Sequence, residues 1–310
     1  MADSFRISAT GLSPYYLPEY VADAMGYFEE VGIKKESYVP EPWTQVMVDI
    51  DTGAAEAVIG GIWVPMMYQR RGKDYRSFCR LAAKSPLSLF GRKKPDHPFR
   101  WTDLENKLTL CAGAHSIGIG VIVGGAAKEY GCDMSKVQIT HDLPANMLME
   151  LFLGGMGDYI AVAPDVALTM EKEGKGYLVT NLCESAGPCP HSAYYATGKA
   201  LDEKTELFGR FCVAMQKGFD FVNSHCAEDM QELLFELWPK KDREAIKYVI
   251  DLFIQNGMWD KTIRLTETEC YRWQRMIKET NYVIDEIRPY EEVVDERPWK
   301  YAAEKLGIEA

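Results

Sequence analysis

Residues 53–75 read GAAEAVIGGIWVPMMYQRRGKDY, and residues 155–177 read GMGDYIAVAPDVALTMEKEGKGY. The two stretches align without a gap, so each residue of the first has a counterpart 102 positions later in the chain. Identical or similar residues occupy the ends and the middle of both: Gly53 and Gly155, Glu56 and Asp158, Val64 and Val166, Gly72 and Gly174, Lys73 and Lys175, Tyr75 and Tyr177. Since only two copies occur, the repeat indicates two similar lobes and not a solenoid.

Both copies have the same local pattern: a glycine turn, an acidic residue, a short apolar run, and a segment that closes at Gly-Lys. A short apolar run between turn signals is typical of a buried parallel strand, and the segment after it has helical character. Ligands of open α/β sheets lie outside the carboxyl ends of the strands. We therefore expect one cleft to be lined by the residues that follow the two runs: Gly60, Gly61, Trp63, Ala163, Pro164 and Asp165. A chance likeness of two unrelated strand–helix units is the alternative.

The segments around the repeat alternate between strand and helix patterns. Before the first copy we expect a strand, a helix, a strand and a helix at 5–10, 17–28, 34–39 and 44–50. This alternation is typical of a parallel sheet with helices on both faces. After residue 201, apolar residues at helical spacing predict three helices, at 208–222, 229–237 and 242–254.

Composition excludes several classes of protein. The 310 residues carry a formal net charge of -11, whereas a general nucleic-acid binder is basic. The two basic clusters, Arg70–Lys73 and Arg92–Lys94, are short and are interpreted as solvated surface. No window approaches the roughly 20 apolar residues of a membrane span, so we expect no direct membrane insertion. The first residues show no signal-peptide pattern. We expect a cytoplasmic protein if Met1 is native, and a periplasmic or extracellular one if a leader was removed.

Eight cysteines are scattered through the chain without a CxxC spacing. A dense disulfide framework is typical of small secreted domains, so free thiols are the simpler expectation. Cys183, Cys189 and His191 do not have a standard zinc spacing, and a fourth ligand is not evident. We expect neither a metal ion nor a cofactor.

Residues 24–33, AMGYFEEVGI, resemble the "GYFEEEGL" signature of type II periplasmic binding proteins. The resemblance is to the nitrate, sulfonate, taurine and thiamine-pyrimidine branch of ABC transporter substrate-binding proteins. Further similar segments extend it over about 5–290: residues 53–60, 101–111, 147–164 and 194–201. It implies an α/β fold of two lobes, each a mostly parallel sheet flanked by helices, joined by a two-strand hinge.

The resemblance also implies how the chain is divided between the lobes. Residues 1–88 and 190–310 would form lobe one with the carboxyl-terminal helices, and residues 89–189 would form lobe two. The two linking stretches would be roughly 77–90 and 181–195.

A candidate anion site follows the strand predicted at 108–111. The strand breaks at Gly113, and His115 or Ser116 can cap the helix that follows. Free amide groups and the helix dipole at such an end attract anions, so we expect a carboxylate, sulfonate or phosphate here. A strand–helix turn without a ligand is the alternative. The resemblance favours the ligand, because the matching turn of the family holds its acidic group.

Aromatic residues follow predicted strand ends or turns in lobe one: Tyr15, Tyr16, Trp43 and Trp63. Such rings suit a flat aromatic or heterocyclic ligand in a mostly apolar pocket, although ordinary packing is an equal alternative. His191 lies in the second linking stretch and is expected to face the same cleft. Ser13, in the loop after the first strand, and Ser85, in the first linking stretch, complete the expected ligand contacts.

Two functions remain open. The first is a solute-binding protein that closes on a small anionic molecule and delivers it to an ABC permease, as most members of the family do. The second is a cytosolic enzyme of the same fold, of the pyrimidine-precursor synthase, desulfinase or decarboxylase type, with His115 or His191 transferring protons. Only Cys189 matches the cysteine-rich run of the pyrimidine synthases. We therefore favour the binding protein.

Overall fold

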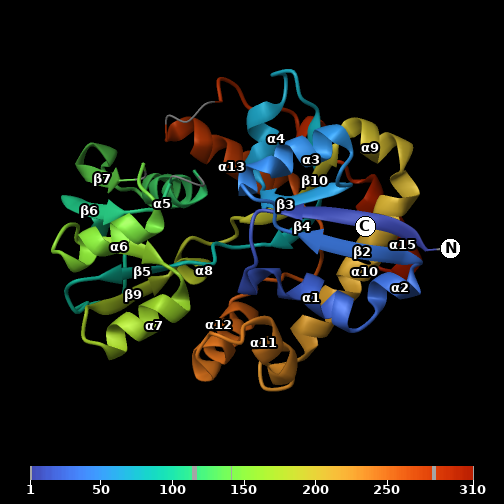
Figure 1. Cartoon of the computed structure of the whole chain (residues 1–310). Helices are drawn as coiled ribbons and strands as arrows, with labels where there is room; N and C mark the ends of the chain where they lie inside the picture. The colour runs from blue at the N-terminus through green and yellow to red at the C-terminus, as the bar shows by residue number, and fades with distance from the viewer. Residues whose placement is uncertain (1, 114–116, 141, 281–283, 310) are drawn as a thin grey trace. The chain divides into compact units, whose positions relative to one another are not determined.

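The computed structural model describes residues 2–113, 117–140, 142–280 and 284–309. The chain forms two compact units (Figure 1). Unit 1 comprises residues 1–83, 190–271 and 287–310, and unit 2 comprises residues 84–189 and 272–286. Lobe two was predicted at 89–189, without residues 272–286.

The sheet of unit 1 has the strand order β2-β1-β3-β10-β4. In that order the strands are Ile33–Tyr38, Asp3–Ala9, Ala57–Gly61, Ser192–Thr197 and Tyr75–Ala82. Strand β1 pairs in parallel with β2 and β3, whereas β10 is antiparallel to both β3 and β4. The sheet thus takes its fourth strand from a part of the chain far from the other four.

The sheet of unit 2 repeats this arrangement with the order β7-β6-β8-β5-β9. Its strands are Val137–Thr140, Lys107–Leu110, Tyr159–Val162, Ser88–Gly91 and Tyr177–Asn181. Strand β6 is parallel to β7 and β8, and β5 is antiparallel to β8 and β9. Each unit therefore contains a mostly parallel sheet with one antiparallel strand in the fourth position, which confirms the predicted two-lobed α/β fold.

The two copies of the sequence repeat have the same structure. In unit 1, β3 leads through α4 (Trp63–Tyr68) to β4, and in unit 2, β8 leads through α7 (Pro164–Lys172) to β9. The aligned glycines at both ends of the copies have left-handed φ angles: 74° and 106° at Gly53 and Gly155, and 81° and 69° at Gly72 and Gly174. Glycine adopts this conformation at little cost, so both copies retain it where the chain turns.

The single helix predicted at 17–28 is interrupted in the structure. Helix α1 spans Leu17–Ala24 and α2 spans Tyr27–Glu30, with Gly26 between them at a φ of 73°. A residue with a left-handed φ angle ends the hydrogen-bond ladder of a helix. The segment therefore forms two helices, although the spacing of its apolar residues continues from α1 into α2. The segment predicted at 44–50 begins as a 3-10 helix (Trp43–Gln45) and continues as α3 (Val46–Thr52).

The three helices predicted after residue 201 are confirmed as α10 (Thr205–Ser224), α11 (Gln231–Leu237) and α12 (Arg243–Gln255). The remaining helices are α5 (Gly118–Glu129), α6 (Ala145–Leu153), α8 (Leu182–Ser185), α9 (Gly198–Glu203), α13 (Glu267–Glu279), α14 (Tyr290–Val293) and α15 (Arg297–Leu306). Short 3-10 helices occur at Pro14–Tyr16, Trp101–Leu104 and Met134–Lys136. None of the helices in the described part of the chain combines the length and apolar composition of a membrane span.

Aromatic rings form the core of unit 1. Phe211 of α10 stacks on Phe5 of β1 at a centroid distance of 4.5 Å, and Phe208 meets Phe78 of β4 at 4.9 Å. Phe5, Phe208 and Phe211 are fully buried. Burying a phenylalanine stabilises a fold by roughly 1.5–3 kcal/mol, so these contacts hold α10 on the sheet.

A buried ion pair joins β4 to α13 in unit 1. Arg80 is only 2% exposed, and its guanidinium lies 2.6 Å from the Glu269 carboxylate. It also donates a hydrogen bond to the Thr262 carbonyl. A buried pair is costly to break because the remaining charge is left without compensation.

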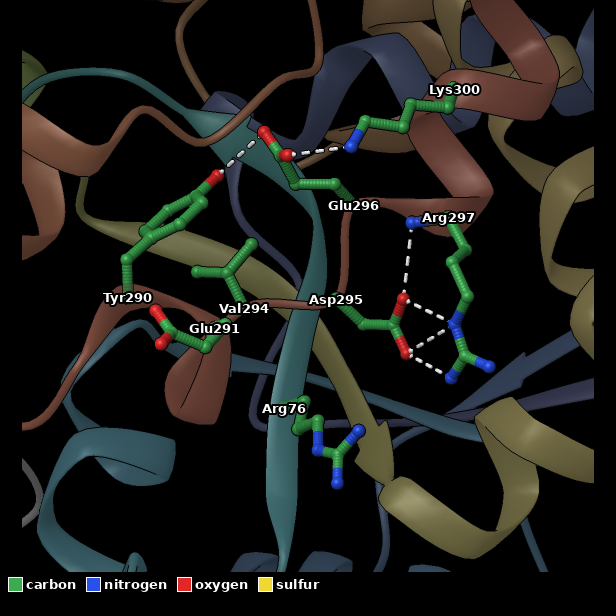
Figure 2. Close-up of a pocket in the computed structure, with 8 residues that line it drawn as sticks. All are labelled: Arg76, Tyr290, Glu291, Val294, Asp295, Glu296, Arg297 and Lys300. Carbon is green, nitrogen blue, oxygen red and sulfur yellow. Dashed lines mark hydrogen bonds and ion pairs between the residues drawn. The ribbon is translucent and has the colours of Figure 1, made fainter.

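The carboxyl-terminal segment covers the edge of the unit 1 sheet. Val294 forms a parallel bridge with Ser77 of β4, and the Asp295 amide donates to the Ser77 carbonyl at 2.8 Å. Figure 2 shows the Asp295 carboxylate bonded to the Arg297 side chain and amide at the start of α15. An uncovered edge strand would invite pairing with another chain, and this segment prevents it over part of β4.

Residues 272–286 belong to unit 2 because α13 packs on α5 there. Met276 lies so close to Gly125 that a Cβ atom at that glycine would be 2.4 Å from the Met276 side chain. Arg272 pairs with Glu129 at 2.7 Å and donates to the Ala186 carbonyl. These contacts are between residues distant in sequence, which explains why the helical pattern did not reveal them.

Candidate functional site

Three segments of unit 1 meet at one edge of its sheet. Strands β1 and β3 are parallel, so their carboxyl ends lie at the same edge. Strand β10 is antiparallel to β3 and begins at that edge, with Ser192 opposite Gly61. The loop after β1, the start of α4 and His191 therefore come together.

Four rings form a continuous group at this edge, here called the aromatic cluster: Tyr15, Tyr16, Trp63 and His191. The His191 ring lies 5.5 Å from Tyr15 and 5.6 Å from Trp63, in edge-to-face orientations. Tyr15 and Tyr16 meet at 4.7 Å. Edge-to-face packing is a favourable geometry for aromatic rings and fixes their orientation.

Gly61 allows Trp63 to occupy its position. A Cβ atom at Gly61 would lie 2.2 Å from the indole ring, far inside van der Waals contact. A Cβ atom at Gly60 would lie 3.0 Å from the Tyr195 hydroxyl. Trp63 is 8% exposed, so it has little room to move away. The Gly-Gly pair of the repeat thus lets two aromatic side chains approach the strand closely.

The tyrosines of the cluster are held by neutral partners. The Tyr16 hydroxyl is hydrogen-bonded with Thr10 and Ser192, and the Tyr15 hydroxyl with Ser13. Burial raises the pKa of both phenols above its ordinary value. Both side chains therefore remain uncharged at neutral pH and can offer hydrogen bonds without adding charge.

His191 is the titratable residue of the cluster. Its backbone amide donates to the Ala82 carbonyl at 2.8 Å, which places the backbone of His191 beside the end of β4. Its Nδ1 atom is buried and has no hydrogen-bond partner in the described part of the chain. Burial lowers the pKa of His191 from 6.5 to about 4. The ring is therefore neutral at pH 7, and Nδ1 is available to a ligand.

Trp43 is not one of the four rings that define the aromatic cluster. It begins the 3-10 helix that follows the turn after β2, and its side chain is half-buried. Because β2 is parallel to β1, this turn follows the carboxyl end of the neighbouring strand. Trp43 is therefore near the same edge of the sheet, one strand further out.

The corresponding edge of unit 2 carries the other predicted residues. Pro164 and Asp165 begin α7 directly after β8, and Gly113 follows β6, with its amide 3.3 Å from the Leu143 carbonyl. His115 and Ser116 lie outside the described residues. Helix α5 begins at Gly118, and Ile117 occupies its N-cap position, where His115 or Ser116 was predicted.

Neutral polar groups lie at this second edge: Ser85, which was predicted from the sequence, and Ser88 and Asn181, which were not. The Ser88 hydroxyl donates to the Asn181 side-chain oxygen at 2.7 Å, and both residues are buried. Nearby Ser85 is 1% exposed, and its hydroxyl has no hydrogen-bond partner among the described residues. Ser88 and Asn181 meet only because β5 pairs with β9, and no local pattern reports such pairing.

A separate pocket of about 270 Å³ lies beside the carboxyl-terminal helices of unit 1 (Figure 2). Its charged side chains bind one another: Glu296 accepts from Tyr290 and pairs with Lys300, both at 3.1 Å, and Asp295 pairs with Arg297. None of the predicted site residues lines it. We assign this pocket a structural role, because its charges stabilise the segment that covers β4.

The described residues contain no group of three or more histidine, cysteine or acidic side chains that could hold a metal ion. Cys183 and Cys189 are buried free thiols. Burial raises the pKa of Cys183 to about 11, which disfavours the thiolate that binds metals.

Comparison with known proteins finds a family model that covers most of the chain and a relative that covers nearly all of it. A family model described as "NMT1/THI5 like" matches residues 13–228. A Bacillus subtilis (strain 168) protein named "Putative binding protein YtlA" is 24% identical over 308 residues, which are 98% of this chain and 90% of that protein.

Solved structures share the fold at low sequence identity. The periplasmic aliphatic sulphonate binding protein SsuA from Escherichia coli has a TM-score of 0.71 at 13% identity, covering 96% of this chain and 93% of that chain. The desulfurization enzyme DSZB has a TM-score of 0.62 at 13% identity, covering 98% of this chain and 99% of that chain. The same fold therefore occurs in a binding protein and in an enzyme.

Proposed function

The chain belongs to the NMT1/THI5-like family, and from that premise we propose that it is the solute-binding protein of an ABC-type importer. Its ligand is a small anionic molecule with an aromatic or heterocyclic ring. The names of its relatives support this proposal, since one is a binding protein and another binds aliphatic sulphonates.

The observation that carries the proposal is the aromatic cluster at the edge of the unit 1 sheet. Ligand sites are mostly apolar surfaces with a few polar groups that orient the ligand. Tyr15 and Trp63 supply ring surfaces, and the unpartnered Nδ1 of His191 supplies one polar contact between them. We propose that the flat part of the ligand contacts this cluster, with Ser13, Trp43, Gly60 and Gly61 beside it.

For unit 2 taken by itself, we propose that polar groups at the carboxyl ends of its strands bind an anionic group. Ser85, Gly113, Pro164 and Asp165 lie at or near the carboxyl ends of its strands, where α/β proteins bind ligands. His115 and Ser116 belong to the same proposed surface on the basis of the sequence alone. That both surfaces contact one ligand stays a prediction from the sequence.

Chemistry disfavours the second candidate, an enzyme that uses His191 for proton transfer. A general acid or base works best when its pKa lies near the operating pH. With a pKa of about 4, His191 carries a proton in only about one molecule in a thousand at pH 7. The same neutral ring is well suited to accept or donate a fixed hydrogen bond. Binding is thus the function that this geometry supports best.

Delivery to a permease follows from the proposed class of protein. We propose an ABC permease as the partner and a location outside the cytoplasmic membrane, as the name of the periplasmic SsuA relative suggests. No role in nucleic-acid binding is proposed, because the net charge of -11 opposes it.

Native mass spectrometry of protein purified from its own host tests the function. We expect a small acid that is retained under native conditions and released unchanged on denaturation. Trp63→Ala should lose this molecule, whereas Tyr248→Ala, which removes an exposed ring from α12, should retain it. Conversion of the released compound by fresh protein would instead identify an enzyme. If the protein carries no acid, even after incubation with an excess of host cell extract, the proposal is refuted.

A further inference from the structure

Lys84 is a half-buried cation for which the structure shows no partner. It is the first residue of unit 2, and within the described chain its ammonium group makes neither an ion pair nor a hydrogen bond. Lys35, whose side chain is only 4% exposed, shows the usual alternative, since it pairs with Glu19 at 2.9 Å and Asp23 at 3.1 Å. Removing a cation from water is costly unless an anion compensates it.

The position of Lys84 in the sheet points to a ligand as that anion. Ser88 begins β5 opposite Val162 and Asn181, the last residues of β8 and β9. Because β5 is antiparallel to both, the residues that precede Ser88 lie beyond the carboxyl ends of those strands. Lys84 and Ser85 therefore occupy the edge where open α/β sheets bind their ligands.

Lys84 lies near the start of α8. The Leu182 amide donates to the Leu87 carbonyl at 2.8 Å, so the start of α8 lies against the segment that carries Lys84. Burial raises the pKa of Cys183. The positive charge of Lys84 lowers this pKa, and the negative charge of Glu184 raises it further, so both charges lie near the Cys183 thiol. Glu184 is exposed and is not ion-paired with Lys84. The ammonium group thus lies near α8 without being neutralised there.

We propose that Lys84 and the Ser85 hydroxyl bind the anionic group of the ligand. This inference rests on the proposed solute-binding function. Ser85 follows Lys84 in the chain, and its buried hydroxyl has no hydrogen-bond partner among the described residues, so an oxygen of a bound anion would satisfy it. Binding of the anion by these two residues requires neither proton transfer nor a covalent bond.

The charge of this surface also selects the class of anion. Lys84 contributes one positive charge to this surface and Asp165 one negative charge, while Ser85, Ser88 and Asn181 are neutral. A single ammonium group neutralises a carboxylate or a sulfonate, whereas a phosphate monoester would bring a second, uncompensated charge into a half-buried place. The ligand is therefore a monoanion.

Binding of charged and neutral probe pairs tests the inference. Calorimetric titrations would compare benzenesulfonate, benzoate and ethanesulfonate with benzenesulfonamide, benzamide and ethanesulfonamide. Wild-type protein should prefer at least one anion over its amide. Lys84→Gln should weaken binding of that anion about 10- to 100-fold, the range for a hydrogen bond to a charged group, and leave the amide within about twofold.

Control variants separate recognition from folding. Lys93→Gln removes an exposed lysine of the same unit and should bind like the wild type. Lys84→Arg retains the positive charge and should keep the preference for the anion. Lys84→Met should unfold at the same or a higher temperature without ligand, because it removes an uncompensated charge, yet it should lose the rise in Tm that the anion produces.

The outcomes distinguish this inference from the proposed function. If the wild type prefers an anion and Lys84→Gln binds it equally well, Lys84 is not an anion ligand, although the binding function stands. If the wild type binds none of the anions and carries no acid from its host, both proposals are wrong. Equal losses for the anion and its amide would show that Lys84 acts only by shaping the fold, which also overturns the inference.

Discussion

Acidification should destabilise this protein, and His191 should account for a defined share of the loss. Its pKa is about 4 in the folded protein against an ordinary 6.5, because burial disfavours the charged ring. Between these two values the unfolded chain binds a proton that the folded protein does not. The stabilising effect is therefore complete above pH 6.5 and is lost as the pH falls towards 4. From pH 7 to pH 5 this difference amounts to about 2 kcal/mol.

Urea unfolding at pH 7 and pH 5 would measure the effect. His191→Gln keeps a neutral polar side chain but cannot titrate, so its free energy of unfolding should fall by about 2 kcal/mol less than that of the wild type over this range. His97→Gln is the matched control, because the His97 side chain is 39% exposed. At pH 7 its free energy of unfolding should lie within about 0.5 kcal/mol of the wild-type value, as is usual for a surface substitution.

Two results would refute the reasoning. An equal loss in the wild type and in His191→Gln would show that other groups cause the whole pH dependence. An NMR titration in which the His191 ring signals change with a midpoint near 6.5 would show that the ring is solvated. Either result would also remove the argument that His191 is a neutral hydrogen-bonding group at pH 7.

Two further predictions concern packing and charge in unit 1. Gly61→Ala places a methyl group against the Trp63 indole and should cost about 1–3 kcal/mol of stability, with a red-shifted tryptophan emission; Gly11→Ala, where the added Cβ meets nothing within 4 Å, should change neither. Arg80→Met leaves the Glu269 carboxylate buried without its partner and should cost about 3–5 kcal/mol in urea unfolding. Replacing Glu269 by Met in the same chain should recover much of that loss, and a double variant as unstable as Arg80→Met would contradict the ion-pair explanation.

Local patterns predicted the elements of the fold well. The repeat indicated two strand–helix segments, and in the structure β4 and β9 begin at the aligned residues Tyr75 and Tyr177 that end the two copies. Apolar spacing also located the helices after residue 201. The helix predicted at 17–28 was wrong in one respect, since spacing alone does not report the left-handed φ of Gly26.

The candidate site was predicted only in part. Tyr15, Tyr16, Trp63 and His191 were selected because they follow strand ends or lie in a linking stretch, and the structure brings their rings together. Lys84 was not selected, because nothing in the sequence marks a lysine as unpaired. That property emerges only from the positions of all the carboxylates around it.

By itself, the sequence determined the alternation of strands and helices, the two similar lobes and the family resemblance. These depend on the period of apolar residues and on glycines at turns, which are properties of neighbouring residues. Only the tertiary structure decided that β10 and β5 insert antiparallel into the two sheets. That insertion places His191 between Tyr15 and Trp63, buries it and lowers its pKa. Backbone pairing and burial depend on residues far apart in the chain, and no local pattern encodes them.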